Sequence, residues 1–363
     1  MRIAVKRGYL LCVALFLLLA ACGTRTGSQA VATQVPAAAT VNPQAAADFY
    51  RGKTISIIVG LGPGGGFDTI ARLVSKHMPR HMPGNPNVVV ENMDGAGSLI
   101  ALNHVYNVAK PDGLTIGVFN ELQINNQLFG NESVQFDLRK MGWLGNAQQG
   151  TTACTIRADS PYAENLLRKD APPLIFGGTG PGSNTDDFAR VLINLAGING
   201  RLVSGYPGTA QIRLAVEGRE VDGMCWTWDS VTATAANWLE TNFITVPVYT
   251  AASVDQRVLD RFPKAILAED LVSDPQTKHL MKVSQAAAAI SKPFVLPPGV
   301  PAERVAALQA AFESTMKDAE FLADAQQARL EISAHNGAQA LVIVNEILNL
   351  PPDQAKKLAD VLK

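Results

Sequence analysis

Short β-branched strands followed by glycine and then by an amphipathic helix pattern recur along this chain and constrain its fold. The first example is TISIIVG (Thr54–Gly60), followed by the turn LGPGGG and the helical pattern FDTIARLV. Successive apolar residues along a strand indicate burial on both faces, as in a parallel sheet covered by helices. NVVVEN (Asn87–Asn92) and LTIGVFN (Leu114–Asn120) continue the alternation, which predicts an α/β fold.

The same alternation begins again after residue 150. TACTIRA and PLIFGG are typical of strands, TGPGSN (Thr179–Asn184) is a second glycine-rich turn, and TDDFARVLINLAG has a helical pattern. The chain is long enough for two lobes with substantial cores. We therefore expect two lobes, each a mainly parallel sheet flanked by helices.

The first 47 residues have the composition of an export segment and a linker. Residues 1–21 combine a basic start with an apolar run, which predicts a secretory signal peptide. LAAC, ending at Cys22, resembles a bacterial lipobox and implies a lipid on that cysteine. Gly23 is not the aspartate typical of inner-membrane retention, so we expect a periplasmic protein with a lipid anchor, preferably in the outer membrane. An ordinary signal peptide that contains a cysteine is the alternative.

Residues 23–47 are rich in Ala, Thr, Gln and Pro, which predicts a flexible tether outside the fold. Beyond this segment two cysteines remain, Cys154 and Cys225. An oxidising periplasm permits a disulfide, but sequence spacing does not place two cysteines within bonding distance. Both lie in apolar strand patterns, so we expect two buried free thiols, with pairing as the alternative.

The charge balance argues against a polyanionic partner. The chain has 31 Lys and Arg against 32 Asp and Glu. Nucleic-acid binding depends on a basic surface that neutralises phosphates, and this composition supplies no excess of positive charge for one. We therefore expect no nucleic-acid partner.

Three predicted helices begin just after glycines, at Gly64–Gly66, Gly95–Gly97 and Gly180–Gly182. Helix N-termini carry backbone N–H groups without intrahelical partners and favour anions. Glycine allows the backbone to approach a ligand closely. Two lobes that offer such turns across a cleft would hold a small carboxylate.

A dinucleotide site is the main alternative for the first turn, because Gly60–Gly65 matches G-x-G-x-x-G. However, Pro63 lies within the turn, and Glu91 follows Gly65 by 26 residues, more than the roughly 20 expected. No G-K-[ST] follows, so a phosphate-binding loop of that type is excluded. We expect no cofactor.

No complete catalytic or metal-binding pattern is present. His77 and His81 have i,i+4 spacing, but prolines interrupt the helix and H-E-x-x-H is absent, so we expect two partly exposed histidines. No G-x-S-x-G surrounds Ser98 or Ser183. Asp186-Asp187 is interpreted as an acidic first helical turn. The sequence predicts no metal site and no enzyme.

Several segments in fixed order resemble the substrate-binding receptors of tripartite tricarboxylate transporters, the Bug family. These segments are PGGGFDTIAR (63–72), VVVENMDGAGSLIA (88–101), AKPDGLTI (109–116), GGTGPGSNTDDFA (177–189), SGYPGTAQIRLAVEGREVDG (204–223) and LPPGVPAERVAALQAAF (296–312). Two departures are Met93-Asp94, where many members have Arg-Pro, and Pro207, where many have Lys. The resemblance covers most of the chain from about Phe49.

The resemblance implies a two-lobed periplasmic binding protein of type II, with the ligand cleft between the lobes. Lobe 1 would comprise residues 48–150 and about 284–363, and lobe 2 residues 151–283. The implied function is capture of a small organic carboxylate and delivery to a membrane permease, by a receptor that we expect to be a monomer. A ligand-sensing subunit for a membrane sensor and an exported enzyme are the alternatives.

The resemblance also implies which residues bind the ligand. They lie in the glycine turns of lobe 1, after its third strand and at two positions of lobe 2: Gly64, Gly65, Gly66, Phe67, Asp68, Gly95, Ala96, Gly97, Ser98, Asn120, Ser183, Asn184, Trp228, Asp229 and Ser230. Asp68 is alternatively a helix N-cap, and Gly97 alternatively serves the turn alone. Trp226 and Trp228 are interpreted as packing beneath the cleft, with a stacking wall as the alternative. A strand shifted by one residue would instead turn Thr227 and Asp229 towards the cleft.

Overall fold

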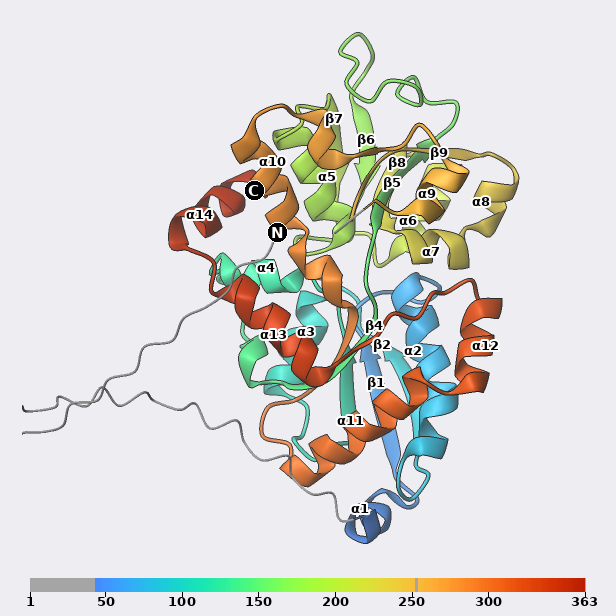
Figure 1. Ribbon diagram of the computed structural model, residues 1–363, viewed down its shortest axis with the longest axis vertical. Helices are drawn as coiled ribbons and strands as arrows, with labels where there is room; N and C mark the ends of the chain where they lie inside the picture. Colours follow the sequence, from blue (N-terminus) through green and yellow to red (C-terminus); the bar gives the residue numbers. More distant parts are fainter. Residues whose placement is uncertain (1–42, 252–253, 363) are drawn as a thin grey trace, which may run out of the picture. The chain divides into compact units, whose positions relative to one another are not determined.

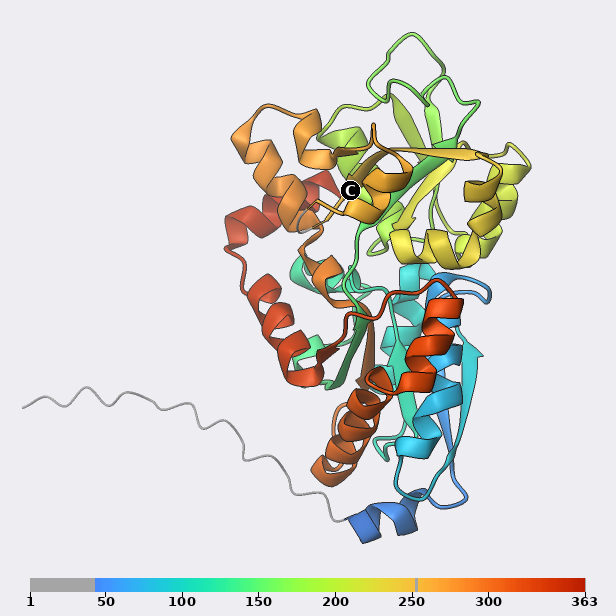
Figure 2. The ribbon, with the colours of Figure 1, turned by 45° about the vertical axis from the view of Figure 1, so that its right-hand side comes forward.

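Two six-stranded sheets organise the computed structural model, which describes residues 43–251 and 254–362 (Figure 1). The first sheet has the order β12–β4–β11–β3–β1–β2 and the second the order β10–β9–β5–β8–β6–β7. Both sheets belong to one compact unit of the chain. We call the first sheet with its helices lobe 1 and the second sheet with its helices lobe 2; Figure 2 gives a second view of both.

Lobe 1 contains strands from both ends of the described chain. They are β1 (Thr54–Val59), β2 (Asn87–Asn92), β3 (Thr115–Val118), β4 (Gly142–Gln148), β11 (Ser291–Leu296) and β12 (His335–Asn336). β1 pairs in parallel with β2 and β3, whereas β11 is antiparallel to β3 and β4, and β12 is antiparallel to β4. The sheet is therefore mixed, with more antiparallel pairing than the sequence predicted.

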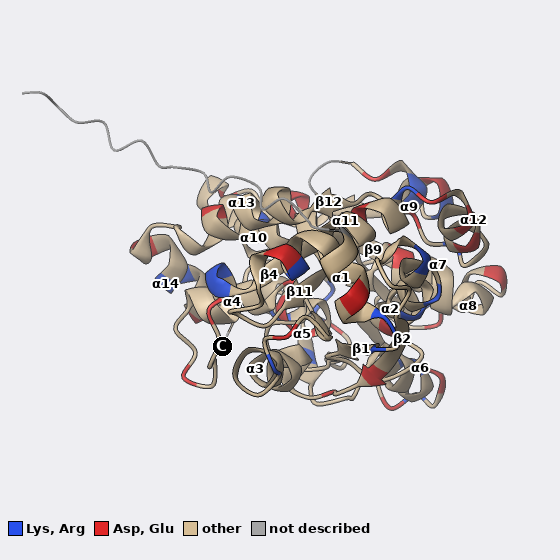
Figure 3. Ribbon diagram, turned by 90° about the horizontal axis from the view of Figure 1, so that it is seen from below, with Lys and Arg blue, Asp and Glu red and all other residues tan. Residues whose placement is uncertain are grey.

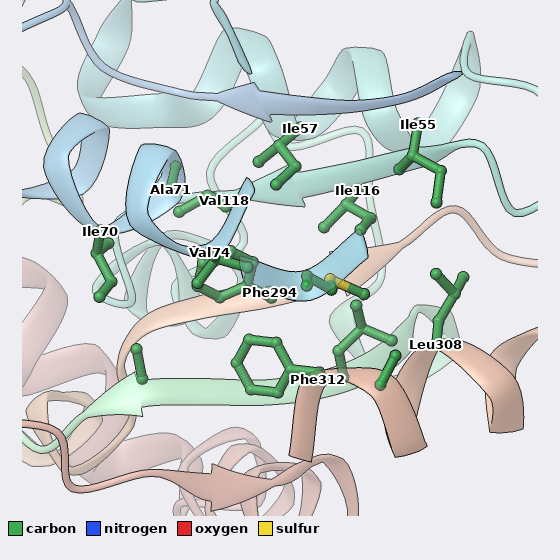
Figure 4. Close-up of a cluster of buried hydrophobic side chains, with 14 of the residues drawn as sticks. Ile55, Ile57, Ile70, Ala71, Val74, Ile116, Val118, Phe294, Leu308 and Phe312 are labelled. Atoms are coloured by element: carbon green, nitrogen blue, oxygen red, sulfur yellow. The ribbon is translucent and has the colours of Figure 1, made fainter. Parts of the chain in front are cut away.

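Helices cover both faces of the first sheet (Figure 1). The helical segments of lobe 1 are α1 (Pro43–Tyr50), α2 (Gly66–His77), η1 (Met78–His81), η2 (Ala96–Ser98), α3 (Leu99–Asn107), α4 (Gln123–Leu128), η3 (Leu138–Lys140), η5 (Ala286–Ile290), α11 (Ala302–Met316), α12 (Ala319–Gln327) and α13 (Gly337–Leu348). One core lies between the sheet and α2, α11 and α12, and the other involves α3 and α13. Figure 4 shows the first core, where Val74 of α2 lies beside Phe294 of β11.

Lobe 2 has a second mixed sheet. Its strands are β5 (Thr152–Arg157), β6 (Leu174–Gly177), β7 (Gly200–Val203), β8 (Gly223–Thr227), β9 (Ile244–Thr250) and β10 (Ile266–Leu267). β6 pairs in parallel with β7 and β8, and β9 pairs in parallel with β10. β5 runs antiparallel to both β8 and β9 and joins the two parallel groups.

The helical segments of lobe 2 include the last helix of the chain. They are α5 (Asn184–Asn194), α6 (Thr209–Glu217), α7 (Trp228–Thr234), α8 (Ala236–Glu240), α9 (Gln256–Arg261), η4 (Ala268–Leu271), α10 (Pro275–Ser284) and α14 (Pro352–Val361). α14 contacts α5 and α10, and Val361 and Leu362 pack against the core that contains Leu192 and Met281. The sequence assigned this end of the chain to lobe 1, but its apolar residues pack on lobe 2.

Two further sequence expectations differ from the structure. The predicted tether extends to Ala47, but Pro43 begins α1, and Ala46 is buried in the lobe 1 core. Cys154 and Cys225 form a disulfide rather than remaining free thiols. They face each other in the register of the antiparallel strands β5 and β8, a proximity that depends on a pairing 71 residues apart in sequence. The signal peptide, Cys22 and most of the tether lie outside the described residues.

The charged residues show no segregation by sign in the view of Figure 3, where acidic and basic positions lie on the same helices and loops. This agrees with the near-neutral composition. Within the described ranges, no helix has the length and apolar character needed to cross a membrane.

Candidate functional site

The glycine turn after β1 (Gly60–Gly66) contacts lobe 2 directly. The N–H of Gly62 donates to the carbonyl of Pro207 at 2.8 Å. A side chain on Gly66 would place its Cβ 1.9 Å from Ser230 Oγ at the start of α7. Glycine at this position therefore allows the start of α2 to pack directly against Ser230.

Asp68 is buried in the first turn of α2 and braces this glycine turn. Its carboxylate accepts hydrogen bonds from Gly64 N at 3.0 Å, Arg72 Nε at 2.9 Å and Asn92 Nδ2 at 3.0 Å. Burial alone would raise the pKa of Asp68, but these hydrogen bonds outweigh burial and lower the pKa. The N-cap of α2 is Gly65, so Asp68 is not the N-cap that the sequence offered as an alternative. Its carboxylate instead holds the glycine turn through the N–H of Gly64.

The turn after β2 has positive φ at four successive residues, with values of 131°, 47°, 63° and 88° from Gly95 to Ser98. This region is uncommon and strained for Ala96 and Ser98. Gly97 N donates to the carbonyl of Thr179 in lobe 2 at 3.1 Å. Gln123 Nε2 fixes the turn by donating to the carbonyl of Gly97 at 2.7 Å. The second glycine turn of lobe 1 thus also contacts lobe 2.

The glycine turn of lobe 2 is braced by two aspartates of the helix that follows it. Gly180 N donates to Asp186 Oδ1 at 2.8 Å, and Gly182 N donates to Asp187 Oδ1 at 2.9 Å. Burial raises the pKa of Asp186, and it raises the pKa of Asp187 to about 7. Ser183 caps α5 and is fully buried, accepting from the N–H of Asp186. The two acids lie in the first turn of α5, as interpreted from the sequence, and in addition hold the turn.

A buried carboxylate, Glu121, connects the lobes just beyond β3. Its Oε1 accepts from Asn184 Nδ2 of lobe 2 at 2.9 Å, and its Oε2 accepts from the backbone N–H of Lys292 at 3.3 Å. Burial raises the pKa of Glu121. Asn120, the residue before Glu121, is also buried. Its backbone N–H donates to Ser98 Oγ in the turn after β2 at 3.1 Å.

The start of α7 brings several polar groups to the same interface. Thr227 Oγ1 lies 2.7 Å from Ser230 Oγ and accepts from Lys292 Nζ at 3.3 Å. Asp229 is buried and pairs with Arg257 at 3.1 Å, and both line a polar cavity of about 280 Å³. β8 ends at Thr227, so Trp228 begins the helix.

Both tryptophans interpreted as packing residues are buried. Trp226 and Trp228 belong to the same lobe 2 core, where Trp226 lies edge-on to Trp238 and Trp228 edge-on to Phe262. Because the strand ends between them, Thr227 turns towards Lys292 while the two indoles remain in the core. The alternative of a stacking wall therefore lacks support from these contacts.

Most of the predicted ligand residues lie where the two lobes meet, whereas Trp228 packs in the lobe 2 core. Three further polar residues that connect the lobes were not predicted. These are Glu121, Gln123 and Lys292. Lys292 carried a usable signal, because it directly precedes the apolar stretch PFVL, and a lysine at the start of a buried strand needs a partner. The structure buries every residue of β11. Glu121 and Gln123 followed a strand in polar sequence and carried no comparable signal.

The histidine pair is structural. His77 is buried, contrary to the expectation of partial exposure, and its Nε2 lies 2.7 Å from Asp324. His81 Nε2 lies 2.7 Å from Asp318. Among the described residues, no cluster of three or more His, Cys, Asp or Glu has an arrangement that could hold a metal ion.

Two α/β lobes whose glycine turns meet across their interface define the class of two-lobed solute-binding proteins. Residues 70–351 match the tripartite tricarboxylate transporter family receptor model. The chain belongs to this family.

Relatives and solved structures agree with this assignment. A UPF0065 protein of Bordetella pertussis is 30% identical over 182 residues, which is 48% of this chain and 55% of the relative. The chain spans about half the length of the curated relatives that it matches. The periplasmic binding protein BugD has a TM-score of 0.70 at 19% identity, with 86% of this chain and 98% of that chain covered. MatC from Rhodopseudomonas palustris with bound malate has a TM-score of 0.64 at 20% identity, with 86% and 99% covered. At these identities the structural likeness shows the fold.

Proposed function

We propose that this chain is an extracytoplasmic receptor that binds a small organic carboxylate between its lobes and delivers it to a tripartite tricarboxylate-type permease. The observation that supports this most directly is the meeting of glycine turns from both lobes, through Gly62–Pro207 and Gly97–Thr179, in a chain of the receptor family. The malate bound to the Rhodopseudomonas palustris relative supports the choice of ligand class.

The proposed binding mode follows from the backbone. In lobe 1, Gly65, Gly66 and Phe67 at the start of α2, and Gly95 and Ala96 in the turn after β2, offer backbone N–H groups. In lobe 2, Ser183, Asn184 and Ser230 offer polar side chains. A carboxylate between these groups would accept hydrogen bonds from both lobes. Asp68, Asn120 and Asp229 have protein partners that fix the surrounding turns. Ligand entry then requires separation of the lobes and closure after binding.

A thermal-shift screen of mono-, di- and tricarboxylates tests this proposal. A ligand at 100 times its dissociation constant stabilises a protein by about 2.7 kcal/mol, so a true ligand should raise the melting temperature measurably. The uncharged amide of each active acid serves as the matched control, and it should have no effect. Absence of any shift across the panel would argue against a carboxylate receptor.

Binding should occur without a chemical change in the ligand, as expected of a receptor. The active acid should be recovered unchanged after prolonged incubation with the protein, as measured by mass spectrometry. Loss of the parent compound in proportion to the protein present would favour an exported enzyme.

The N-terminal region is proposed to anchor the receptor. Residues 1–21 would be removed as a signal peptide and Cys22 would carry lipid, which holds the monomeric receptor at the periplasmic side of a membrane, preferably the outer membrane. Cys22→Ser should release the protein from isolated membranes into the soluble fraction. Retention of the variant on membranes would contradict the lipid anchor.

A further inference from the structure

A fully buried lysine, Lys292, lies in the middle of the interface between the lobes. Its exposed fraction is 0%, and its backbone has φ of 56°, in the left-handed region that non-glycine residues rarely adopt. Strained backbone of this kind is concentrated at functional sites. Burial of a charged side chain is costly unless an opposite charge or hydrogen bonds compensate it. The groups around Nζ therefore show whether the protein itself supplies that compensation.

The neighbours of Lys292 Nζ come from both lobes and include predicted ligand residues. Nζ lies 5.6 Å from the centre of the Phe67 ring in lobe 1. In lobe 2 it donates to Thr227 Oγ1 at 3.3 Å, and that hydroxyl lies 2.7 Å from Ser230 Oγ. The ammonium therefore lies beside two residues, Phe67 and Ser230, that the sequence assigned to the ligand site.

The nearby carboxylates are engaged with other groups. Asp229 pairs with Arg257 at 3.1 Å. Glu121 accepts from Asn184 Nδ2 and from the backbone N–H of Lys292. Both acids attract the ammonium, yet the hydrogen bond that Nζ makes to a described residue goes to a neutral hydroxyl. Burial lowers the pKa of Lys292 and raises the pKa of Glu121, as expected when compensation is incomplete. An anionic ligand would supply the missing partner.

Lys292 lies apart from the contacts of the Gly95–Ser98 turn, on the side of Phe67 at the end of the Gly60–Gly66 turn. Gly97 contacts Thr179, Pro181 and Gly180, whereas Lys292 contacts Thr227 and Phe67. A ligand with one carboxylate at the Gly95–Ser98 turn would meet Lys292 through a second anionic group placed on the side of Phe67 and Thr227.

We propose that Lys292 binds a second carboxylate of the ligand and selects di- or tricarboxylates over monocarboxylates. This rests on the proposed function, since it assumes a carboxylate ligand between the lobes. A buried lysine that pairs with a carboxylate makes a charge-assisted hydrogen bond, and such bonds contribute more than neutral ones. A monocarboxylate that carries a methyl group in that position cannot accept this hydrogen bond, and the buried ammonium then stays without a negatively charged partner.

The experiment compares acids that differ by one carboxylate, using isothermal titration calorimetry on the full chain. Succinate is paired with butyrate, and malate with 2-hydroxybutyrate, because each second compound replaces one carboxylate with a methyl group. The wild-type protein should bind the dicarboxylate of at least one pair on the order of 10- to 100-fold more tightly. Lys292→Met should abolish this preference by weakening the dicarboxylate alone, while the monocarboxylate changes less than about threefold. Lys356→Met, at a side chain that is 79% exposed, is the matched control and should retain the preference.

The outcomes separate this inference from the proposed function. If neither the four acids nor any member of the wider carboxylate panel binds the wild-type protein, the proposed function fails. If carboxylates bind but the wild-type protein shows no preference for a second carboxylate, the role of Lys292 is overturned. Equal weakening of both members of a pair by Lys292→Met would indicate a purely structural lysine and also overturn it. If the methionine variant does not fold, Lys292→Gln, which keeps a polar group but loses the charge, carries the same prediction.

Discussion

In each lobe, an aspartate at the start of a helix accepts a hydrogen bond from the glycine turn before it, and we call this aspartate the brace of the turn. The pKa values of the two braces are shifted in opposite directions. In lobe 1, Asp68 in the first turn of α2 accepts the N–H of Gly64. In lobe 2, Asp187 in the first turn of α5 accepts the N–H of Gly182. Arg72 pairs with Asp68 and the pKa of that carboxyl is lowered, whereas burial raises the pKa of Asp187 to about 7.

The difference shows that the same kind of hydrogen bond, from a glycine N–H to an aspartate in the following helix, does not fix the pKa of that aspartate. The lobe 1 turn is held by an acid that stays ionised over the neutral range, because an arginine and an asparagine stabilise its charge. The lobe 2 turn is held by an acid that gains or loses a proton near neutral pH. The predictions on Asp187, Asp68 and Arg72 test this contrast, and the prediction on Gly66 tests the contact between the lobes.

The largest expected effect is on the pH dependence of stability, through Asp187→Asn. The folded pKa of Asp187 lies above its ordinary value, so its contribution to stability is present at low pH and is lost as pH rises through about 7. A tenfold change in proton affinity is worth about 1.4 kcal/mol, so the loss between pH 4 and pH 8 should be roughly 4 kcal/mol. Urea unfolding across this range should show that Asp187→Asn removes this component.

Asp68→Asn is the matched control for the sign of that effect. The folded pKa of Asp68 lies below its ordinary value, so its contribution is present above that value and is lost as pH falls below it. The variant should therefore lose stability near neutral pH and show little difference from the wild-type protein under acidic conditions. The same pH profile for both variants would contradict the contrast between the two braces.

The second prediction concerns the contact between the lobes rather than the stability of one lobe. Gly66 lies in α2 without a positive φ, so its backbone accepts alanine, but the new Cβ would lie 1.9 Å from Ser230 Oγ. By contrast Gly180 and Gly182 have φ of 136° and 78°, so alanine there would strain the fold itself. Gly66→Ala should reduce carboxylate affinity about 100-fold, or about 2.8 kcal/mol, with the free energy of unfolding nearly unchanged.

Calorimetric titration measures the affinity, and Gly66→Ala with Ser230→Gly forms a double-mutant cycle. If the clash prevents closure, the double variant should recover part of the affinity that Gly66→Ala loses, relative to Ser230→Gly alone. Unchanged affinity of Gly66→Ala would mean that this contact between the lobes is not formed in the bound state.

The third prediction removes the lobe 1 brace completely. Asp68→Ala leaves the N–H of Gly64 without its acceptor and Arg72 without its ion partner, and it leaves Asn92 Nδ2 with only its bond to the Leu61 carbonyl. These hydrogen bonds are partly buried, and a hydrogen bond to a charged group contributes about 1.5–3 kcal/mol. The free energy of unfolding should therefore fall by about 2 kcal/mol at pH 7. Asp48→Ala, at a side chain that is 56% exposed, is the control and should change stability far less. Equal effects would remove any special role of the brace.

The sequence predicted the fold class, the glycine turns and the family because these depend on local patterns of strand, glycine and helix. The disulfide and the packing of α14 were predicted incorrectly, since each depends on contacts between distant segments. The candidate site was predicted as a set of loops, but the buried Lys292 and Glu121 between the lobes were not. Lys292 approaches Glu121 and Thr227 only after β11 returns to the first sheet, 171 residues beyond Glu121. A local sequence pattern does not predict contacts between residues so far apart in the chain.

The smallest expected effect comes from Arg72, and it separates the charge of the lobe 1 brace from its hydrogen bonds. Arg72→Met removes the ion pair of Asp68 but leaves the bonds from Gly64 and Asn92 in place. Because the Arg72 side chain is 52% exposed, solvent screens the pair, and the free energy of unfolding should fall by only about 0.5–1 kcal/mol. Urea unfolding measures this loss, and 1 M salt should reduce the difference between variant and wild-type protein. A loss as large as that of Asp68→Ala would mean that the arginine, rather than the backbone hydrogen bond, holds the turn, and the two lobes would then differ in the brace itself and not only in its charge.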